Sequence, residues 1–458
     1  MNKKYGLTLF LIVVIFSQAF SQVQWISSTE SSPWRSNNPL PIEKYSKNET
    51  ALLELFPGEK QQQIDGFGGC FNERGMDALS VLSSEKRQEV IQQLFDSKLG
   101  CAFNICRMPI GASDYAMDYY SLDDTAGDYA MKYFSIDRDR KYLIPYIKLA
   151  MQYNPDLKIW GSPWTPPSWM KENEHYACQG TEKTSKIKWD PIILDAYALY
   201  FKRYIEAYRD EGINVYAIHV QNEPYACQNF PSCLWTGAEL RDFIKNYLGP
   251  ELSDLDVEIW LGTINNGNYN DCAGVVLADP KARQFITGVG YQWDGKKAIK
   301  TTWEKHPEMK LMQTESECGG SENNMHSALY TYSLIDHYLK AGANSYMYWN
   351  MVLDKSGLSS WGWPQNSMIS IDRRTRESKY NMEFYVMKHF AHFIKSGAFR
   401  INTSGNDENA LAFVNPDNSM ILVVMNNSAS VKNYTVKVKD KMFEARISAY
   451  SFNTFQIR

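Results

Sequence analysis

Short apolar runs and longer amphipathic runs alternate along most of this 458-residue chain. Eight of the apolar runs have the length of buried β-strands, and a helical pattern or a long loop follows each of them. They are IDGFGG (64–69), NICRMPI (104–110), KIWGSPW (158–164), YAIHVQNE (216–223), VEIWLGT (257–263), ITGVGYQW (286–293), KLMQTES (310–316) and NSYMYWN (344–350). Eight such units over roughly 300 residues predict an α/β fold built on a (β/α)8 TIM barrel. An open doubly wound sheet is the competing layout, but no G-x-G-x-x-G follows the first run.

The pattern changes after residue 394. Five later runs are short and alternating, with Asn, Asp, Ser or Lys residues between them: ALAFVN, MILVVMN, YTVKVKD, ARISAY and FNTFQIR. They predict a small antiparallel β-sandwich. The run ALLELFPG near residue 51 also has strand character and could complete this domain from the N-terminal side. We therefore expect N-terminal strands of the β domain over residues 23–62, the barrel over 63–394 and the C-terminal β-sandwich over 395–458.

The first 22 residues have the organisation of a targeting segment. MNKKYGLTLFLIVVIFSQAFSQ contains two lysines, an apolar stretch from Leu7 to Ile15, and then small and polar residues. This order is typical of a cleaved secretory signal peptide, and the apolar stretch is too short to span a membrane. We expect a signal peptide over residues 1–22 and a mature protein that is secreted, periplasmic or at the cell surface, without stable membrane insertion.

Composition argues against several classes of partner. The formal net charge is −4 and no basic run occurs, so nucleic acid and anionic membrane surfaces are not expected partners. The chain has no C-x-x-C and no H-E-x-x-H, and His389 and His392 read as ordinary helix residues, so no metal is expected. The eight cysteines would tolerate disulfides after export. Cys227 and Cys233 are close enough to bridge a loop, whereas the full pairing and the oligomeric state stay open.

Acidic residues stand at the ends of two predicted barrel strands. Barrel enzymes carry their chemistry at these carboxyl ends, where Glu223 closes the fourth run and Glu315 and Glu317 close the seventh. A pair of carboxylates about 5 Å apart is the arrangement of a retaining glycosidase. Glu223 would protonate the leaving oxygen and Glu315 would attack the anomeric carbon. Strand alternation puts Glu315 and Glu317 on the same face, and Arg107 of the second run could keep one of them ionised.

Three other interpretations of these glutamates stay open at this stage. They could be salt-bridged structural residues. They could also belong to an inverting hydrolase, in which the carboxyl groups lie about 6.5–9.5 Å apart. The chain could instead be a glycan-binding protein without activity.

Aromatic residues make up 14% of the chain, and several follow predicted strands. Flat rings with polar neighbours suit a carbohydrate site, because a ring can cover the apolar face of a sugar. The tryptophans after the third and eighth strands fit this description: Trp164, Trp169, Trp349, Trp361 and Trp363. Trp160 and Trp260 lie inside strands and are expected to be core residues.

Together these segments resemble glycoside hydrolase family 30, which contains glucosylceramidases and endo-β-1,6-glucanases. The matching elements, in family order from about residue 50 to the C-terminus, are QQIDGFGG, NICRMPIGASDY, GSPWTPPSWMK, VQNEP, GVGYQW, LMQTESECGG, YMYWN and WGWPQNS. The resemblance implies a (β/α)8 barrel with a side β domain, a retaining mechanism and no cofactor. It implies that Glu223 is the acid/base, that Glu315 is the nucleophile, and that Arg107 lies beneath the nucleophile. It implies substrate-contacting positions at Asp114, Trp164, Asn222 and Trp349. Tyr291, Trp293 and Trp363 are further candidate substrate contacts.

One departure bears on the substrate. Animal-type glucosylceramidases usually carry His-Trp-Tyr where this chain has Tyr291, Gln292 and Trp293. The segments PYACQNFPSCLW, GYQWDGK and QTESECGG resemble bacterial β-1,6-glucanases more closely. We therefore expect a secreted endo-β-1,6-glucanase acting on β-glucan. A glucosylceramidase or exo-β-glucosidase of the same family, and a xylan-directed member, remain alternatives, and the sequence leaves endo- against exo-action open.

Overall fold

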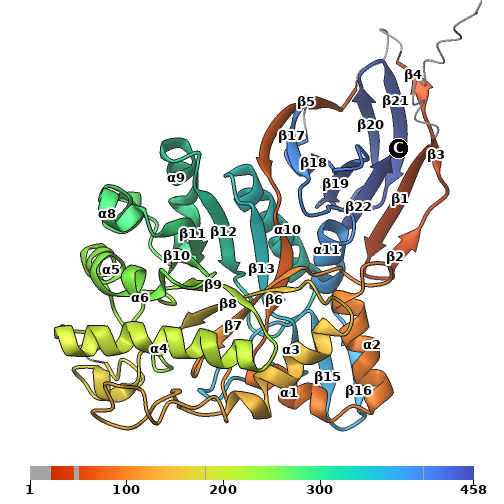
Figure 1. The fold of residues 1–458 in the computed structure, drawn as a ribbon. Helices are drawn as coiled ribbons and strands as arrows, with labels where there is room; N and C mark the ends of the chain where they lie inside the picture. The colour runs from red at the N-terminus through yellow and green to blue at the C-terminus, as the bar shows by residue number, and fades with distance from the viewer. Residues whose placement is uncertain (1–21, 46–50, 181, 406) are drawn as a thin grey trace, which may run out of the picture.

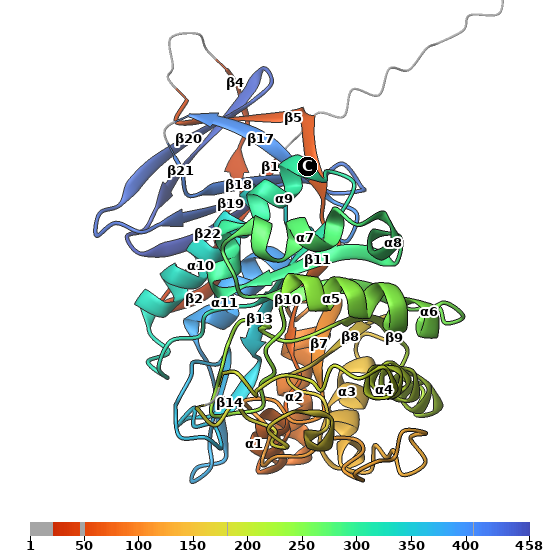
Figure 2. The same ribbon diagram turned by 90° about the vertical axis from the view of Figure 1, so that its left-hand side faces the viewer.

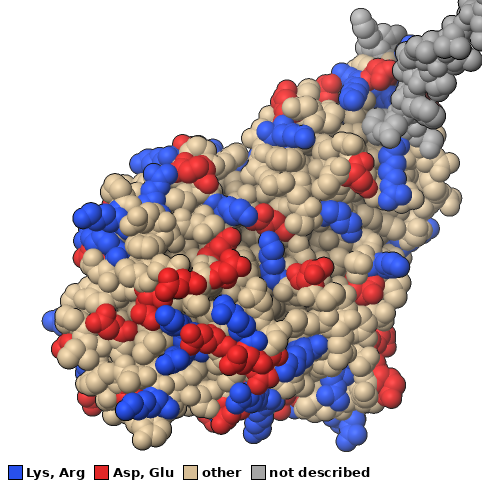
Figure 3. All heavy atoms as spheres, viewed as in Figure 1, with Lys and Arg blue, Asp and Glu red and all other residues tan. Residues whose placement is uncertain are grey.

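A computed structural model describes residues 22–45, 51–180, 182–405 and 407–458 (Figure 1). Apart from Gln22, which begins the first strand, the predicted signal peptide lies outside these ranges. The chain forms a barrel and a β-sandwich that pack against each other, as Figures 1 and 2 show from two sides. Basic and acidic side chains are interspersed over the face seen in Figure 3.

The barrel is a closed sheet of eight parallel strands within the described ranges, in the order β10-β11-β12-β13-β6-β7-β8-β9. The strands are β6 (Gly66–Cys70), β7 (Ile105–Ile110), β8 (Lys158–Pro163), β9 (Val215–His219), β10 (Glu258–Ile264), β11 (Ile286–Gln292), β12 (Lys310–Glu315) and β13 (Ser345–Asn350). Each predicted run overlaps one of them, so the predicted TIM barrel is confirmed. The fourth run is the exception in length, because β9 ends at His219 and not at Glu223.

Side chains fill the interior of the barrel. Trp160 of β8 and Trp260 of β10 are buried there, as predicted. The His219 imidazole lies between their rings, with centroid distances of 4.1 Å and 5.3 Å. The backbones of β6 and β7 lie so close at Gly68 that only glycine fits, because a Cβ atom there would lie 1.7 Å from the carbonyl oxygen of Ile105. This packed interior supports the side chains at the carboxyl ends of the strands.

Helices surround the barrel because their apolar faces pack on its strands. The longest, α4, begins after the capping residue Asp190 with Pro191 in its first turn, and ten of its side chains are buried. The helices are α1 (Glu73–Ser80), α2 (Ser84–Phe95), α3 (Leu143–Met151), α4 (Pro191–Asp210), α5 (Gly237–Phe243), α6 (Gly249–Leu252), α7 (Ala273–Leu277), α8 (Pro280–Arg283), α9 (Ile299–Lys305), α10 (Met325–Lys340) and α11 (Met382–Ala391). No helix in the described ranges is both long and apolar enough to cross a bilayer.

The β-sandwich is one sheet of eleven described strands that encloses its own apolar core. Both ends of the chain contribute: β1 (Gln22–Thr29), β2 (Ser32–Ser36), β3 (Leu40–Pro41), β4 (Glu43–Lys44), β5 (Leu53–Gln63), β17 (Phe399–Gly405), β18 (Ala410–Val414), β19 (Met420–Asn426), β20 (Lys432–Val438), β21 (Lys441–Ile447) and β22 (Ser451–Ile457). The ALLELFPG run lies in β5, which pairs with β17 and β20. A three-stranded sheet follows the last barrel strand: β14 (Val352–Asp354), β15 (Ile369–Asp372) and β16 (Glu377–Tyr380).

Helices α10 and α11 join the two parts (Figure 2). The buried hydroxyl of Tyr332 on α10 donates to the carbonyl oxygens of Asn409, at 2.8 Å, and Val423, at 3.0 Å, in the sandwich. The ring of His389 on α11 hydrogen-bonds with Ser28 and Thr454, at 2.9 Å and 2.8 Å. Satisfied buried polar contacts of this kind fix the sandwich firmly on the barrel.

One disulfide joins Cys178 to Cys227, with 5.2 Å between their Cα atoms. It ties the loop after β8 to the loop after β9, both at the carboxyl ends of the barrel strands. The bridge suggested by sequence proximity, Cys227 to Cys233, is wrong, because Cys233 is a buried free thiol. In the described chain, no group of three or more His, Cys, Asp or Glu side chains could hold a metal ion.

Candidate active site

A pocket of about 540 Å³ opens at the carboxyl ends of the barrel strands. Most of the site residues predicted from sequence line it. The lining consists of Asp114, Trp164, Asn222, Glu223, Ala226, Gln228, Asn229, Phe230, Asn265, Trp293, Glu315, Gly319, Trp363, Pro364 and Gln365. The loop residues from Ala226 to Phe230 and Asn265 were not predicted, because no strand pattern places them.

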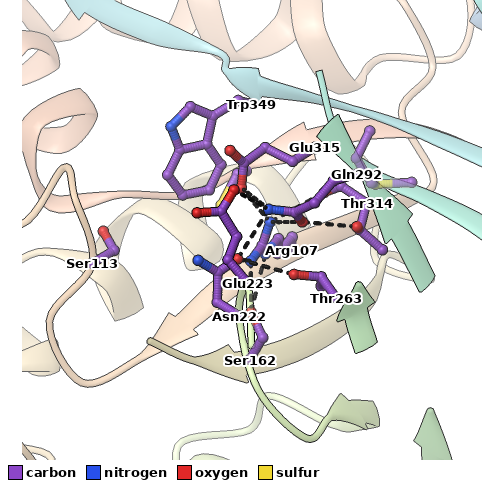
Figure 4. Close-up of polar contacts among 12 residues, drawn as sticks. Arg107, Ser113, Ser162, Asn222, Glu223, Thr263, Gln292, Thr314, Glu315 and Trp349 are labelled. Atoms are coloured by element: carbon purple, nitrogen blue, oxygen red, sulfur yellow. Dashed lines mark hydrogen bonds and ion pairs between the residues drawn. The ribbon is translucent and has the colours of Figure 1, made fainter. Parts of the chain in front are cut away.

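Arg107, on β7, lies fully buried beneath the two glutamates (Figure 4). Its Nη1 donates to Glu315 Oε2 at 2.8 Å and to the carbonyl oxygen of Thr314 at 3.2 Å. Its Nη2 donates to Asn222 Oδ1 at 2.6 Å, and both Nε and Nη2 donate to Ser162 Oγ. A guanidinium whose donors are shared among β8, β12 and the loop after β9 cannot rotate freely, so it fixes Glu315 and Asn222 relative to each other.

Glu315, the last residue of β12, accepts hydrogen bonds on both carboxylate oxygens. Besides the Arg107 contact, Oε2 accepts from Gln292 Nε2 at 3.0 Å, and Oε1 accepts from the indole of Trp293 at 3.1 Å. Burial raises the pKa of Glu315, while the Arg107 charge and these hydrogen bonds oppose that rise. Glu317 instead pairs with Lys296 at 2.5 Å. Arg107 therefore pairs with Glu315, and Glu317 has a different cationic partner.

Glu223 stands on the loop after β9, with φ of +46°. Backbone contacts hold it there, because its N–H donates to the Thr263 carbonyl at 3.1 Å and that of Asn222 donates to the Pro163 carbonyl at 2.7 Å. A left-handed conformation is unfavourable for a side chain of this size and is typical of functional sites. Burial, reinforced by the nearby Glu315 charge, raises the pKa of Glu223 to about 8.

Gln292 joins the two carboxyl groups. Its Nε2 lies 3.2 Å from Glu223 Oε1 and 3.0 Å from Glu315 Oε2. These oxygens can be no further apart than the sum of the two distances, about 6 Å. The amide itself is oriented by Thr314, whose hydroxyl donates to Gln292 Oε1 at 2.9 Å. Sequence analysis missed Gln292, although strand alternation from the barrel interior would have found it.

The same alternation corrects the prediction for Tyr291. Its side chain is fully buried on the outer side of β11, where its hydroxyl shares a hydrogen bond with Thr302 of α9. It does not line the pocket, because neighbouring residues of a strand point to opposite faces. We therefore remove Tyr291 from the candidate substrate contacts.

The predicted tryptophans divide into two groups. Trp164 lines the pocket, and Trp349 of β13 stacks on it with 5.3 Å between ring centroids. The Arg107 guanidinium lies 4.4 Å from the Trp164 ring, an attractive cation–π arrangement. Trp363 lines the pocket rim and packs on Phe230. Trp169 and Trp361 lie outside the pocket lining.

Two buried polar atoms near the pocket have no hydrogen-bond partner within the described chain, Asp114 Oδ1 and Trp349 Nε1. Next to an open pocket, such atoms are available to hydrogen-bond with a ligand or with water. One atom accepts and the other donates, which suits the hydroxyl groups of a sugar.

Comparison with known proteins agrees with this geometry. The Glycosyl hydrolase family 30 TIM-barrel domain matches residues 64–394, and the family 30 beta sandwich domain matches residues 397–455. The chain belongs to glycoside hydrolase family 30. It is therefore a glycosidase, and the predicted family and fold are confirmed.

The proteins that are similar to this family 30 chain are named after different substrates. It is 33% identical to putative glucosylceramidase 1 of Caenorhabditis elegans, over 85% of this chain and 79% of that protein. Two solved structures are each 25% identical to it in sequence. SrfJ from Salmonella typhimurium has a TM-score of 0.87, over 95% of this chain and 99% of SrfJ. The endo-β1,6-glucanase BT3312 has a TM-score of 0.82, over 96% of this chain and 99% of BT3312.

Proposed function

We propose that this family 30 member hydrolyses β-glucosidic bonds with retention of anomeric configuration, and that β-1,6-linked glucan is its substrate. The observation that carries the proposal is the single amide nitrogen of Gln292 within hydrogen-bond distance of both Glu223 and Glu315. Retaining glycosidases hold their carboxyl groups about 5–5.5 Å apart and inverting ones about 6.5–9.5 Å. An upper bound of about 6 Å favours retention.

In the first step, the ionised Glu315 attacks the anomeric carbon while Glu223 gives its proton to the departing glycosidic oxygen. The bond to the leaving group breaks as a glycosyl ester to Glu315 forms. Esterification removes the negative charge that helps to raise the pKa of Glu223, so the Glu223 carboxylate can then accept a proton from water. Attack of that water on the anomeric carbon releases the sugar and restores both groups.

The remaining pocket groups suit one glucosyl unit. Trp164 offers an aromatic wall, and the unpartnered Asp114 Oδ1 and Trp349 Nε1 would meet sugar hydroxyls. Burial, together with the charges of Glu315 and Glu223, raises the pKa of Asp114 well above its usual range. Asp114 would then donate as well as accept hydrogen bonds.

The linkage is proposed from the endo-β1,6-glucanase BT3312, which aligns with almost the whole chain. A second candidate substrate, glucosylceramide, is favoured by the higher identity to a putative glucosylceramidase. Export is part of the proposal too, and the Cys178–Cys227 disulfide suits an oxidising compartment. Recovery of the protein from inside cells with residues 1–22 still attached would contradict export.

Product analysis tests the proposed function. The protein is incubated with the β-1,6-glucan pustulan, laminarin, glucosylceramide and an aryl β-glucoside, and the first-formed sugar is followed by NMR. We expect pustulan to yield sugars whose new reducing end is first β and then mutarotates. An α-anomer formed first would show inversion, release from glucosylceramide alone would select the second candidate, and no release from any substrate would leave only sugar binding.

The pH dependence of kcat/KM should be bell-shaped. The rate falls as pH rises through the pKa of Glu223, about 8, because the leaving oxygen then lacks its acid. It falls as pH drops through the pKa of Glu315, which burial places above the ordinary glutamate value, because a protonated carboxyl cannot attack. Initial rates at low substrate concentration between pH 4 and 10 check this, on glucan or on phenyl β-glucoside, whose leaving groups need an acid. A profile that stays flat above pH 8 would contradict the role of Glu223.

A further inference from the structure

Two further pockets follow the catalytic pocket toward the sandwich. One, of about 520 Å³, lies between the loop after β12 and the first turns of α10. The other, of about 560 Å³, lies between the start of α10 and two sandwich turns, the β1–β2 turn at residues 29–31 and the β21–β22 turn at residues 449–450. We call these two pockets together the distal groove.

The catalytic pocket and the distal groove share lining residues. Trp293 and Gly319 line both the catalytic pocket and the first part of the groove. His326 lines both parts of the groove. The three hollows are therefore consecutive, and the last one is built partly from the sandwich.

Aromatic rings stand at each stage of this path. Trp293 has φ of +49° and its indole N–H donates to Glu315, so its ring is held where the catalytic pocket and the groove meet. Tyr330 on α10 is 40% exposed, and Tyr450 in the β21–β22 turn is 44% exposed. Large aromatic side chains that remain exposed at concave surfaces are typical of recognition sites.

Both tyrosines are held in position. The Tyr330 hydroxyl donates to Glu317, which Lys296 pairs in turn. The Tyr450 backbone has φ of +43° and its N–H donates to the Ser428 carbonyl at 3.0 Å. This backbone conformation fixes the direction in which the Tyr450 side chain leaves the turn.

We propose that the distal groove binds the stretch of glucan chain that extends beyond the catalytic pocket, with Tyr330 and Tyr450 as stacking platforms. The polar side chains of Glu322, Asn324 and His326 would meet sugar hydroxyls. The sandwich is fixed to α10 and α11 by the Tyr332 and His389 contacts, so the groove is one rigid surface. This proposal rests on the proposed function only for the identity of the bound polysaccharide, a β-1,6-glucan.

The test compares a polymer with a substrate that cannot reach the groove. Tyr330→Ala and Tyr450→Ala should each weaken retardation in gels containing β-1,6-glucan and lower kcat/KM on that polymer, by about two- to tenfold. Turnover of an aryl β-glucoside should be unchanged. Tyr450→Phe keeps the ring and should behave as the wild type. Tyr330→Phe keeps the ring but loses its hydrogen bond to Glu317, so its effect should be smaller than that of Tyr330→Ala. Tyr133→Ala removes a tyrosine that is 69% exposed and lines neither part of the groove, so it should change nothing.

Each contrary outcome points to one proposal. If both alanine variants bind and cleave the polymer as the wild type does, the groove proposal is wrong while the proposed function stands. The same holds if Tyr133→Ala causes an equal loss, or if aryl glucoside turnover falls in parallel. If the wild type releases no sugar from β-1,6-glucan, the proposed linkage is wrong. The gel measurements would then still test the groove. Retardation of the wild type by β-1,6-glucan that is lost in the alanine variants would show that the groove binds this glucan.

Discussion

The Glu315→Ala variant should lose hydrolysis of β-glucosides by on the order of 10⁴- to 10⁶-fold, the size seen when a catalytic nucleophile is removed. Without this carboxylate no glycosyl ester can form, while Glu223 remains to protonate the leaving group. Azide fits the space of the lost carboxylate and should restore turnover of an activated aryl β-glucoside. Because azide attacks from the Glu315 side, the product should be the α-glucosyl azide, which NMR identifies.

Stability must be measured alongside, because this substitution leaves the Arg107 charge without its partner in a buried site. Such a loss costs about 3–5 kcal/mol. The Glu258→Ala variant is a matched control. Glu258 begins β10 at the opposite end of the barrel and accepts from the Trp260 indole at 2.8 Å, so its removal should leave turnover intact. Wild-type rates in a folded Glu315→Ala protein would remove Glu315 from its role.

The Glu223→Gln variant should separate substrates by their leaving groups. We expect a loss of on the order of 10²- to 10⁴-fold on glucan, whose alkoxide must be protonated, and a much smaller loss on a dinitrophenyl β-glucoside. The amide oxygen of the new glutamine can still accept from Gln292, so the site should keep its shape. The fall in kcat/KM above pH 8 should also disappear, since the titrating group is gone.

Azide distinguishes the two glutamates. In the Glu223→Gln variant the glycosyl ester to Glu315 still forms, and azide attacks it from the opposite side of the sugar. The product should then be the β-glucosyl azide, the opposite anomer from that of Glu315→Ala. The same anomer from both variants would contradict the double displacement.

The sequence predicted the barrel well because each barrel strand overlaps a short run that is rich in apolar residues. Glu315 is the last residue of β12, in agreement with its predicted position near the end of the seventh run. The sequence missed where β9 ends, because Val220 and Gln221 still donate to the carbonyls of Trp260 and Gly262 beyond the strand. That paired but irregular segment carries Glu223 in a conformation that periodicity does not predict.

The errors at the site arose because residues were chosen by type, without regard to the face of the strand on which each side chain lies. Tyr291 is aromatic and near the strand end, but alternation points it at α9 and turns Gln292 into the barrel. The Cys178–Cys227 disulfide closes a separation of 49 residues between two loops, so spacing along the chain could not reveal it. Spacing along the chain also could not predict that Phe230 and Asn265 line the pocket, because both residues lie on loops.

Strand β1 pairs along its length with β22, with Val23 opposite Ile457. During synthesis, β2 follows β1 directly and can pair with one of its edges, whereas the other edge meets β22, which is made much later. The barrel can assemble meanwhile, whereas the sheet that packs on α11 closes last. Contacts between such distant parts of a sequence form slowly, and an unpaired strand edge is prone to associate with other chains.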